Sequence, residues 1–243
     1  MKMLFFARRN AREILRNPLT VGFSLGFPVV ILALLSAIQA NVPVDLFRLE
    51  TLTPGVTIFG LAFMTLFSAT LIARDRETAF LQRLYTTPLT AADFIFGYLL
   101  PVAPIALAQC TACYLFAMLL GLKPSVTMIW AVLTVLPAAL LFIGLGLLCG
   151  SVMNTKQVGG ICGALLTNLT AWLSGTWFDL KLVGGAFEKI ACALPFFHAV
   201  QMEQAALRGD FGGMMPHLYV VLFYLALTGV AATLLFLRQM REK

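Results

Sequence analysis

The chain has 243 residues, of which 60% are hydrophobic and only 12% are charged. A soluble domain averages about 25% charged residues, and a disordered chain combines low hydrophobicity with high charge, so this composition excludes both classes. The formal charge is +6. In so apolar a chain, an excess of basic residues indicates membrane orientation rather than nucleic-acid binding.

Six stretches without Asp, Glu, Lys or Arg are longer than the roughly 18 residues that mark a candidate membrane helix. They cover residues 17–44, 51–73, 94–122, 124–155, 157–178 and 211–237. Within them we predict spans over residues 20–39, 56–73, 94–120, 127–150, 158–176 and 217–237. The predicted fold is an all-α membrane protein with six transmembrane helices, in a single transmembrane domain over residues 1–243.

The basic residues predict the orientation of this domain. With the N-terminus inside, the inner segments carry 12 Lys and Arg residues and the outer segments carry five. This bias places both termini in the cytoplasm, and an even number of spans requires both termini on one side.

Residues 1–17 precede the first span and have the pattern of an amphipathic helix. One side gathers the apolar residues Leu4, Ala7, Ala11, Ile14 and Leu15, and another gathers Arg8, Arg9, Arg12 and Arg16. Such a helix lies in the inner headgroup layer with its arginines near anionic lipid. Two interpretations stay open, a positive-inside anchor or an elbow that moves with the first span.

The inner segment 74–93 has a pattern typical of a short helix across the cytoplasmic mouth. Asp75 and Glu77 would lie near its start and Arg83 nearer its end, as the helix dipole favours. The residues Phe80, Leu81 and Leu84 make an apolar ridge. A plain connecting loop is the alternative, but the ridge favours a docking element for another protein.

Two further features delimit this short helix. Pro88 ends it, because proline removes a backbone donor. Thr90 and Asp93 have the spacing of a capping box that starts the third span.

The outer segment 179–216 contains a second element too short to cross a membrane. Residues 190–202 are free of charge but number only 13, a length that suits a re-entrant segment. Pro195 lies inside this stretch. We therefore predict a re-entrant helical hairpin over residues 184–202, marked by Gly184, Gly185 and Pro195, before the last span.

These features resemble the integral membrane permease subunits of bacterial ATP-binding-cassette exporters of the type-2 permease class. The resemblance covers the whole chain and is strongest at RETAFLQRLYTTPL, residues 76–89. Further matches are the Leu-Ser-Gly run at residues 173–175, Trp177-Phe178, and the Leu-Pro-Phe run at residues 194–196. The resemblance implies that residues 74–93 hold a cytoplasmic coupling helix that docks on an ATPase through Arg76, Glu77, Phe80, Leu81, Arg83, Leu84 and Pro88.

The resemblance also implies a function. The chain would be the permease subunit of an exporter that moves an amphiphilic or hydrophobic substrate (a drug, an antibiotic, a lipid or a lipid-linked glycan) out of the cytoplasm. Two cytoplasmic ATPase subunits would bind ATP and magnesium, and the permease itself would be no enzyme and bind no cofactor. A second permease chain, an identical copy in the simplest case, would complete the complex in the bacterial inner membrane, in contact with lipid but not with nucleic acid.

The residues themselves support an external source of energy. The chain has no phosphate-binding Gly-x-x-x-x-Gly-Lys-Ser/Thr motif. No charged residue lies inside the six predicted spans, whereas ion-coupled carriers keep such residues there. A self-contained carrier or channel is the main alternative, and a small membrane enzyme, which would need clustered catalytic groups, is the other.

Several smaller motifs suit packing or polar roles, and for two of them a second interpretation stays open. The Gly-x-x-x-Gly motifs at Gly22/Gly26, Gly146/Gly150 and Gly159/Gly163 suit helix packing within the chain or at a dimer seam, and the family resemblance puts the first and fifth spans near the seam. Of the five cysteines, the Cys-x-x-Cys motif at Cys110 and Cys113 lies inside a span and indicates packing. His198 and His217 lack metal-ligand partners and suit hydrogen-bonded polar roles. The 20 phenylalanines suit an aromatic-lined route or ordinary lipid-facing packing.

Overall fold

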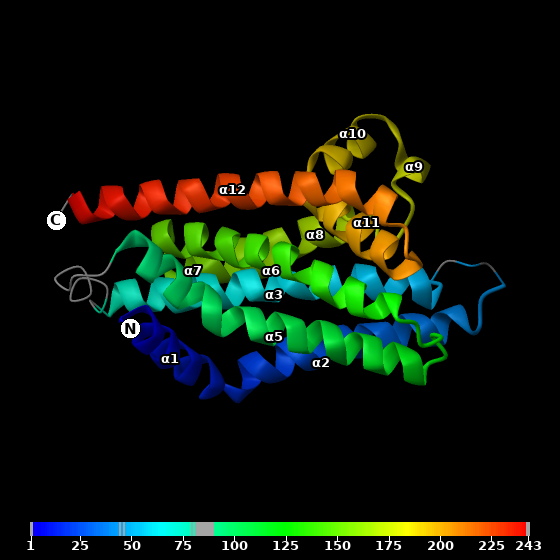
Figure 1. Cartoon of the computed structure of the whole chain (residues 1–243), viewed down its shortest axis with the longest axis horizontal. Helices are drawn as coiled ribbons and strands as arrows, with labels where there is room; N and C mark the ends of the chain where they lie inside the picture. The colour runs from blue at the N-terminus through cyan, green and yellow to red at the C-terminus, as the bar shows by residue number, and fades with distance from the viewer. Residues whose placement is uncertain (1, 44, 46, 79, 81–89, 242–243) are drawn as a thin grey trace.

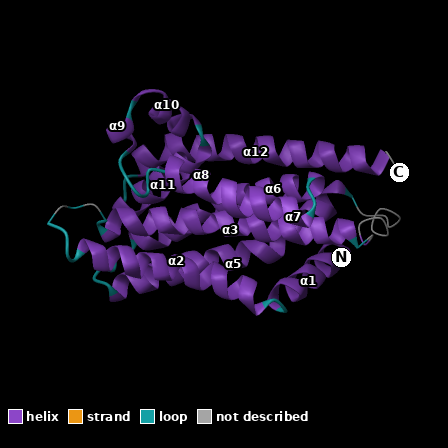
Figure 2. Cartoon of the chain, turned by 180° about the vertical axis from the view of Figure 1, so that it is seen from behind, coloured by secondary structure: helices purple, strands orange, loops and turns teal. Residues whose placement is uncertain are grey.

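The computed structural model describes residues 2–43, 45, 47–78, 80 and 90–241. All regular structure in these residues is helical (Figure 2). The long helices run side by side in a bundle (Figure 1). The start of α1 and the end of α12 lie at one end of it, here called the termini end, and α9 and α10 project at the opposite end, here called the hairpin end.

Twelve helical segments make up the described chain. They are α1 (Lys2–Leu15), α2 (Pro18–Gln39), α3 (Leu49–Glu77), α5 (Ala91–Leu119), α6 (Thr127–Val152), α7 (Thr155–Val158), the π-helix η1 (Gly159–Leu166), α8 (Thr167–Leu173), α9 (Leu180–Val183), α10 (Gly185–Ala193), α11 (Pro195–Arg208) and α12 (Phe211–Arg241).

The helices match the predicted spans closely. In the described residues, α2, α3, α5, α6 and α12 are each long and apolar enough to cross a bilayer. The predicted span over residues 158–176 is occupied by α7, η1 and α8, which follow one another without a break from Thr155 to Leu173. The all-α class is thus confirmed in this part of the chain, and a membrane crossing by α7, η1 and α8 stays a prediction.

Helix α3 is the centre of the bundle. In its most apolar window 78% of the residues are buried, compared with 17% in α2 and in α12. Helix α6 packs closest to it, because a Cβ atom on Gly150 would lie 2.4 Å from the Ala69 carbonyl oxygen. The Thr65 hydroxyl also donates to the Phe142 carbonyl oxygen over 2.7 Å. The small residues thus let two backbones approach closely, as in other membrane helix pairs.

The ends of α3 and α5 test two expectations. The Thr90–Asp93 capping box at the start of α5 is confirmed. The expectation that Asp75 and Glu77 begin a new helix is wrong, because both lie in the last turn of α3. Helix α3 continues past the charged Asp75, because Arg9 of the same chain forms an ion pair with that carboxylate.

Candidate functional site

The candidate site lies at the termini end, around the last turn of α3. Among the residues predicted to contact an ATPase, Arg76 and Glu77 lie in this turn and Phe80 follows it. Leu81, Arg83, Leu84 and Pro88 lie outside the described residues. The contacts of the predicted coupling segment are therefore described for its first residues, at the end of α3 and at Phe80.

Arg76 and Glu77 fasten the junction between α6 and α7 to α3. The Arg76 guanidinium donates to the carbonyl oxygens of the α6 end, at Ser151, Val152 and Met153. These carbonyls have no partner within their helix, and a cation there also complements the helix dipole. The Glu77 carboxylate accepts hydrogen bonds from the backbone nitrogen of Thr155 over 2.8 Å and from its hydroxyl over 2.7 Å. Both charges thus stabilise contacts within the chain.

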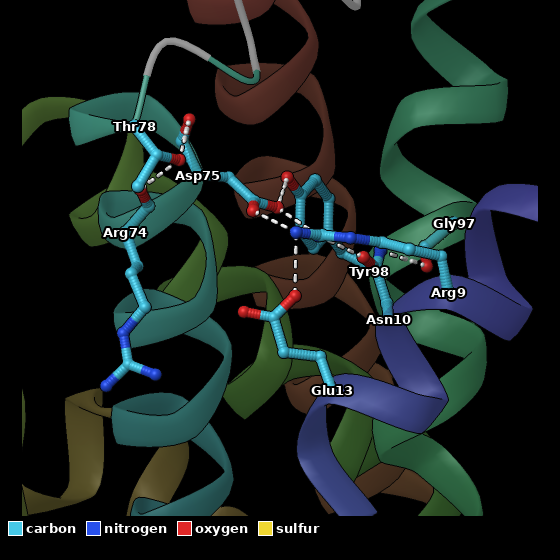
Figure 3. A network of polar contacts seen from close by, with 8 residues as sticks. All are labelled: Arg9, Asn10, Glu13, Arg74, Asp75, Thr78, Gly97 and Tyr98. Carbon is cyan, nitrogen blue, oxygen red and sulfur yellow. Dashed lines mark hydrogen bonds and ion pairs between the residues drawn. The ribbon is translucent and has the colours of Figure 1, made fainter. Parts of the chain in front are cut away.

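Asp75 points into the bundle and is the centre of a second network (Figure 3). Its side chain is only 2% exposed. Arg9 donates from two guanidinium nitrogens to the two carboxylate oxygens, each over 2.6 Å. The Tyr98 hydroxyl donates to the same carboxylate over 2.7 Å, and Glu13 holds Arg9 from the other side at 2.7 Å. The network joins α1, α3 and α5.

The N-terminal helix also inserts an aromatic ring into this junction. Phe6 packs edge-on against Tyr98, with ring centroids 4.9 Å apart, and stacks near Phe80 and Phe94. Gly97 makes room for it, because a Cβ atom there would lie 2.2 Å from the Phe6 ring. The Arg9 guanidinium lies over the Phe80 ring, 4.3 Å from its centroid. Helix α1 therefore contacts Phe80 of the predicted coupling segment.

These contacts correct the predicted surroundings of residues 1–17. Ala7 and Ile14 are buried against the bundle, while Leu4 and Leu15 are 61% and 65% exposed. Arg9, which the sequence groups with Arg8, Arg12 and Arg16, binds Asp75 within the chain. This pair was not predicted, because the arginines of the helix were treated as one set. The available signal was Phe6, Asn10 and Ile14, which share a face with Ala7 at helical spacing.

At the hairpin end, the predicted glycines and proline shape two consecutive helices. Gly184 and Gly185 have φ angles of 62° and 63°, a region that other residues rarely adopt. Pro195 is the first residue of α11, after an extended Leu194. Proline suits this position because the missing N–H would have no partner there.

Helix α11 carries a carboxyl group into the bundle. Glu203 is fully buried, and its oxygens lie 2.7 Å from the Thr57 hydroxyl of α3 and 2.8 Å from the Tyr114 hydroxyl of α5. Burial raises the pKa of Glu203 to about 8. The Thr57 hydroxyl also lies 2.7 Å from the Pro54 carbonyl oxygen. A single hydroxyl proton cannot serve both acceptors, so a protonated Glu203 that donates to Thr57 satisfies every group.

Glu203 bears on the expectation that the energy for transport comes from outside the chain. The predicted span interiors do lack charged residues. However, α11 lies outside those spans in the sequence and places the carboxyl group of Glu203 against α3 and α5. The absence of charged residues inside the predicted spans therefore does not exclude an ion-coupled carrier. Glu203 was not predicted to be buried, because it follows the short charge-free stretch 190–202 within the segment assigned to the outer side.

The glycine motifs divide into two groups. Gly146 and Gly150 pack against α3 within the chain, as Ser68 and Ala69 would block a side chain at either position. In contrast, a Cβ atom on Gly22, Gly26 or Gly159 would meet nothing within 4 Å, and one on Gly163 would meet only Leu66, at 3.4 Å. Packing inside the chain is thus confirmed for the α6 motif alone. The other two motifs leave open space beside α2 and η1.

The two histidines are partners of each other. Their Nδ1 atoms lie 2.8 Å apart, and His198 Nε2 lies 2.8 Å from the Cys192 carbonyl oxygen. Because a carbonyl oxygen only accepts, a neutral His198 donates through Nε2 and accepts from His217 through Nδ1. The predicted hydrogen-bonded roles are confirmed.

A comparison with family models identifies the chain. Residues 2–207 match the model of the ABC-2 type transporter. No curated protein and no solved structure matches the chain. The chain belongs to the ABC-2 type transporter family and is a membrane permease component of an ABC transporter.

Proposed function

We propose that this chain is the permease subunit of an ATP-driven exporter that moves an amphiphilic or hydrophobic substrate out of the cytoplasm. The family match over residues 2–207 is the observation that carries the proposal. In this proposal the chain crosses a bacterial inner membrane six times, with α7, η1 and α8 as the fifth crossing. Both termini and the segment 74–93 face the cytoplasm.

Separate ATPase subunits supply the energy in this proposal, and ATP and magnesium bind to them alone. The coupling helix within residues 74–93 is their docking element. Arg9 and Asp75 tie α1, α3 and α5 together beside this segment, and Arg76 and Glu77 tie α3 to α6 and α7. A push on the segment would therefore reach five helices at once, which supports its role in coupling.

A second copy of the permease completes the transporter in this proposal. Gly22, Gly26 and Gly159 line faces that the chain itself leaves open, and Gly163 borders Leu66 alone. Close approach of helices at small residues is a common means of association in membranes. Lipid covers the remaining apolar surface.

The test is co-purification of the permease with the ATPase encoded in the neighbouring reading frame. We expect a Leu84→Asp variant to lose the ATPase, because a charge would disrupt the predicted apolar ridge. Reversing Glu77 would be a poorer choice, since Glu77 also holds Thr155. A Thr155→Val variant is the matched control, because it weakens that internal contact and should keep the ATPase.

Two results would contradict the proposal. One is transport by the purified permease without any ATPase. The other is equal ATPase recovery with Leu84→Asp and with the parent chain.

A further inference from the structure

One stripe of α3 is only half-buried in the bundle, and it ends at the exposed Arg74. Its members recur at helical spacing of three or four residues and are Phe63, Leu66, Phe67, Thr70 and Arg74. The neighbouring positions of α3 are buried. The stripe passes between α2, which contributes Phe27, and η1, where Gly163 lies beside Leu66. Leu66, Phe67, Thr70 and Arg74 line a hollow in this stripe, here called the α3 groove.

At the termini end the stripe opens into a pocket of about 180 Å³. Asn17, Thr70 and Arg74 contribute its polar groups, and Ile14, Leu66 and Phe67 contribute apolar walls. The Arg74 side chain runs along α3, away from the Asp75 network (Figure 3). Among the described residues it forms no hydrogen bond or ion pair. The pocket therefore offers a cation beside apolar surface.

The nearby acids have partners of their own. Asp75 is held by Arg9, Glu13 also binds Arg9, and Glu77 accepts from Thr155. An anionic group that enters this pocket would thus meet Arg74, whose charge also acts on Glu77 but which forms no ion pair among the described residues. A cationic group would meet repulsion.

A series of aromatic rings continues from this pocket toward the hairpin end. Phe67 lies 6.5 Å from Phe63, and Phe63 lies 5.3 Å from Phe27 and 6.1 Å from Phe59, between ring centroids. Phe59 in turn lies 5.4 Å from Trp177. Successive contacts of this kind form an unbroken apolar track along α3.

The track ends beside a larger cavity at the hairpin end, with a volume of about 510 Å³. Trp177 lines this cavity together with Lys181, Gln201 and Gln204. Two acids also line it, but Asp45 pairs with Arg48 and Asp179 accepts from the backbone nitrogen of Lys181. A cationic side chain thus lies near each end of the track.

We propose that this groove binds a single-chain amphiphile with an anionic headgroup, with the headgroup at Arg74 and the apolar chain along Phe67, Phe63 and Phe27. The small pocket and the single row of rings suit one chain rather than two. The proposal rests on the proposed export function and narrows its substrate class. Passage along the rings would bring the headgroup to the polar cavity beside Trp177.

The test is photolabelling of the full chain in nanodiscs of phosphatidylcholine. Three 16-carbon probes carry the same mid-chain diazirine and differ only in the headgroup, which is a carboxylate, an alcohol or an amine. Mass spectrometry locates the label. We expect the carboxylate probe to label residues 63–70 about fivefold more than the other two, the factor that corresponds to a favourable exposed ion pair.

Variants separate the headgroup contact from the apolar track. Arg74→Gln should lower labelling by the carboxylate probe to the level of the alcohol, and Arg74→Lys should retain most of it. Arg12→Gln is the matched control, because Arg12 is an exposed arginine of α1 and should leave labelling unchanged. Unfolding temperatures confirm that each variant is folded.

Three outcomes would overturn the proposal. They are equal labelling by all three probes, no effect of Arg74→Gln, and loss of labelling when phosphatidylglycerol is added, which would make the groove a site for two-chain lipid. No ATPase takes part in this assay. If the carboxylate probe labels the groove but the ATPase does not co-purify, the proposed exporter is refuted and the binding site stands. If the ATPase co-purifies but the probe does not label the groove, only the binding site is refuted.

Discussion

Asp75 brings a negative charge into the packed interior, and Arg9 is its principal partner. Arg9→Ala would leave that carboxylate with the Tyr98 hydroxyl as its remaining side-chain donor in Figure 3. Hydrogen bonds to charged groups contribute about 1.5–3 kcal/mol each, and Arg9 is partly exposed, so we expect a loss of about 2 kcal/mol. For a chain of this size that loss lowers the unfolding temperature by about 4–8 °C. Thermal unfolding in detergent measures it.

Arg12→Ala is the control for this prediction, because Arg12 is exposed on the same helix. It should change the unfolding temperature little. Equal effects of the two substitutions would show that Arg9 acts only through general charge.

Glu203 predicts a dependence of stability on pH. Its pKa rises from 4.5 to about 8 on folding because burial disfavours the charged form. The folded state therefore holds a proton that the unfolded state releases, so stability is greatest below pH 4.5 and falls as the pH rises toward 8. Glu203→Gln should flatten this part of the profile, and Glu50→Gln, at an exposed position, should not. A wild-type unfolding temperature that rises across this range would refute the protonated carboxyl.

Contacts within one helical turn were predictable from the sequence, whereas contacts between residues far apart in the chain were not. The Thr90–Asp93 cap was predictable because both partners lie within one turn. The partner of Asp75 lies 66 positions away in Arg9, and that of Glu203 lies 146 positions away in Thr57. Spacing within a helix carries no information about such contacts, which depend on how the helices are arranged.

Gly150 and Gly22 offer a matched test of helix packing. Gly150→Ala would place a methyl group 2.4 Å from the backbone of α3, and forced overpacking costs about 1–3 kcal/mol. Gly22→Ala meets open space and removes a glycine from a helix, which gains roughly 0.5–1 kcal/mol. The same substitution should therefore lower the unfolding temperature at position 150 and raise it slightly at position 22. Changes of equal sign would contradict the packing of α6 on α3.

The positions of the helices along the chain were more predictable than their burial within the bundle. Charge-free length located α2, α3, α5, α6 and α12, because a bilayer requires about 20 apolar residues in a row. Length also marked residues 190–202 as too short to span. It did not reveal that α11 is buried among α3, α6 and α12, since burial against other helices and burial in lipid select the same apolar residues. The π-helical hydrogen bonding of η1 likewise leaves no mark on composition.

The arrangement of the whole bundle agrees with the parity of the predicted spans. An even number of crossings returns the chain to its starting side, and α1 and the end of α12 do lie at one end (Figure 1). The second copy in the proposed transporter has to be inferred from what one chain leaves open. The open glycine faces lie on α2 and η1, on either side of the half-buried stripe of α3.

This placement predicts where two copies meet. A two-fold axis brings the same surface of both chains together, so α2 of one chain would lie near η1 of the other. We expect Gly22→Cys with Gly163→Cys, in a chain whose five native cysteines are replaced by alanine, to give a cross-linked dimer in membranes. Thr111→Cys, on the exposed face of α5, should remain monomeric under the same oxidant. If denaturing gels show no dimer from the glycine positions, or as much from Thr111, the second copy does not sit beside the α3 groove, and the groove then faces lipid instead.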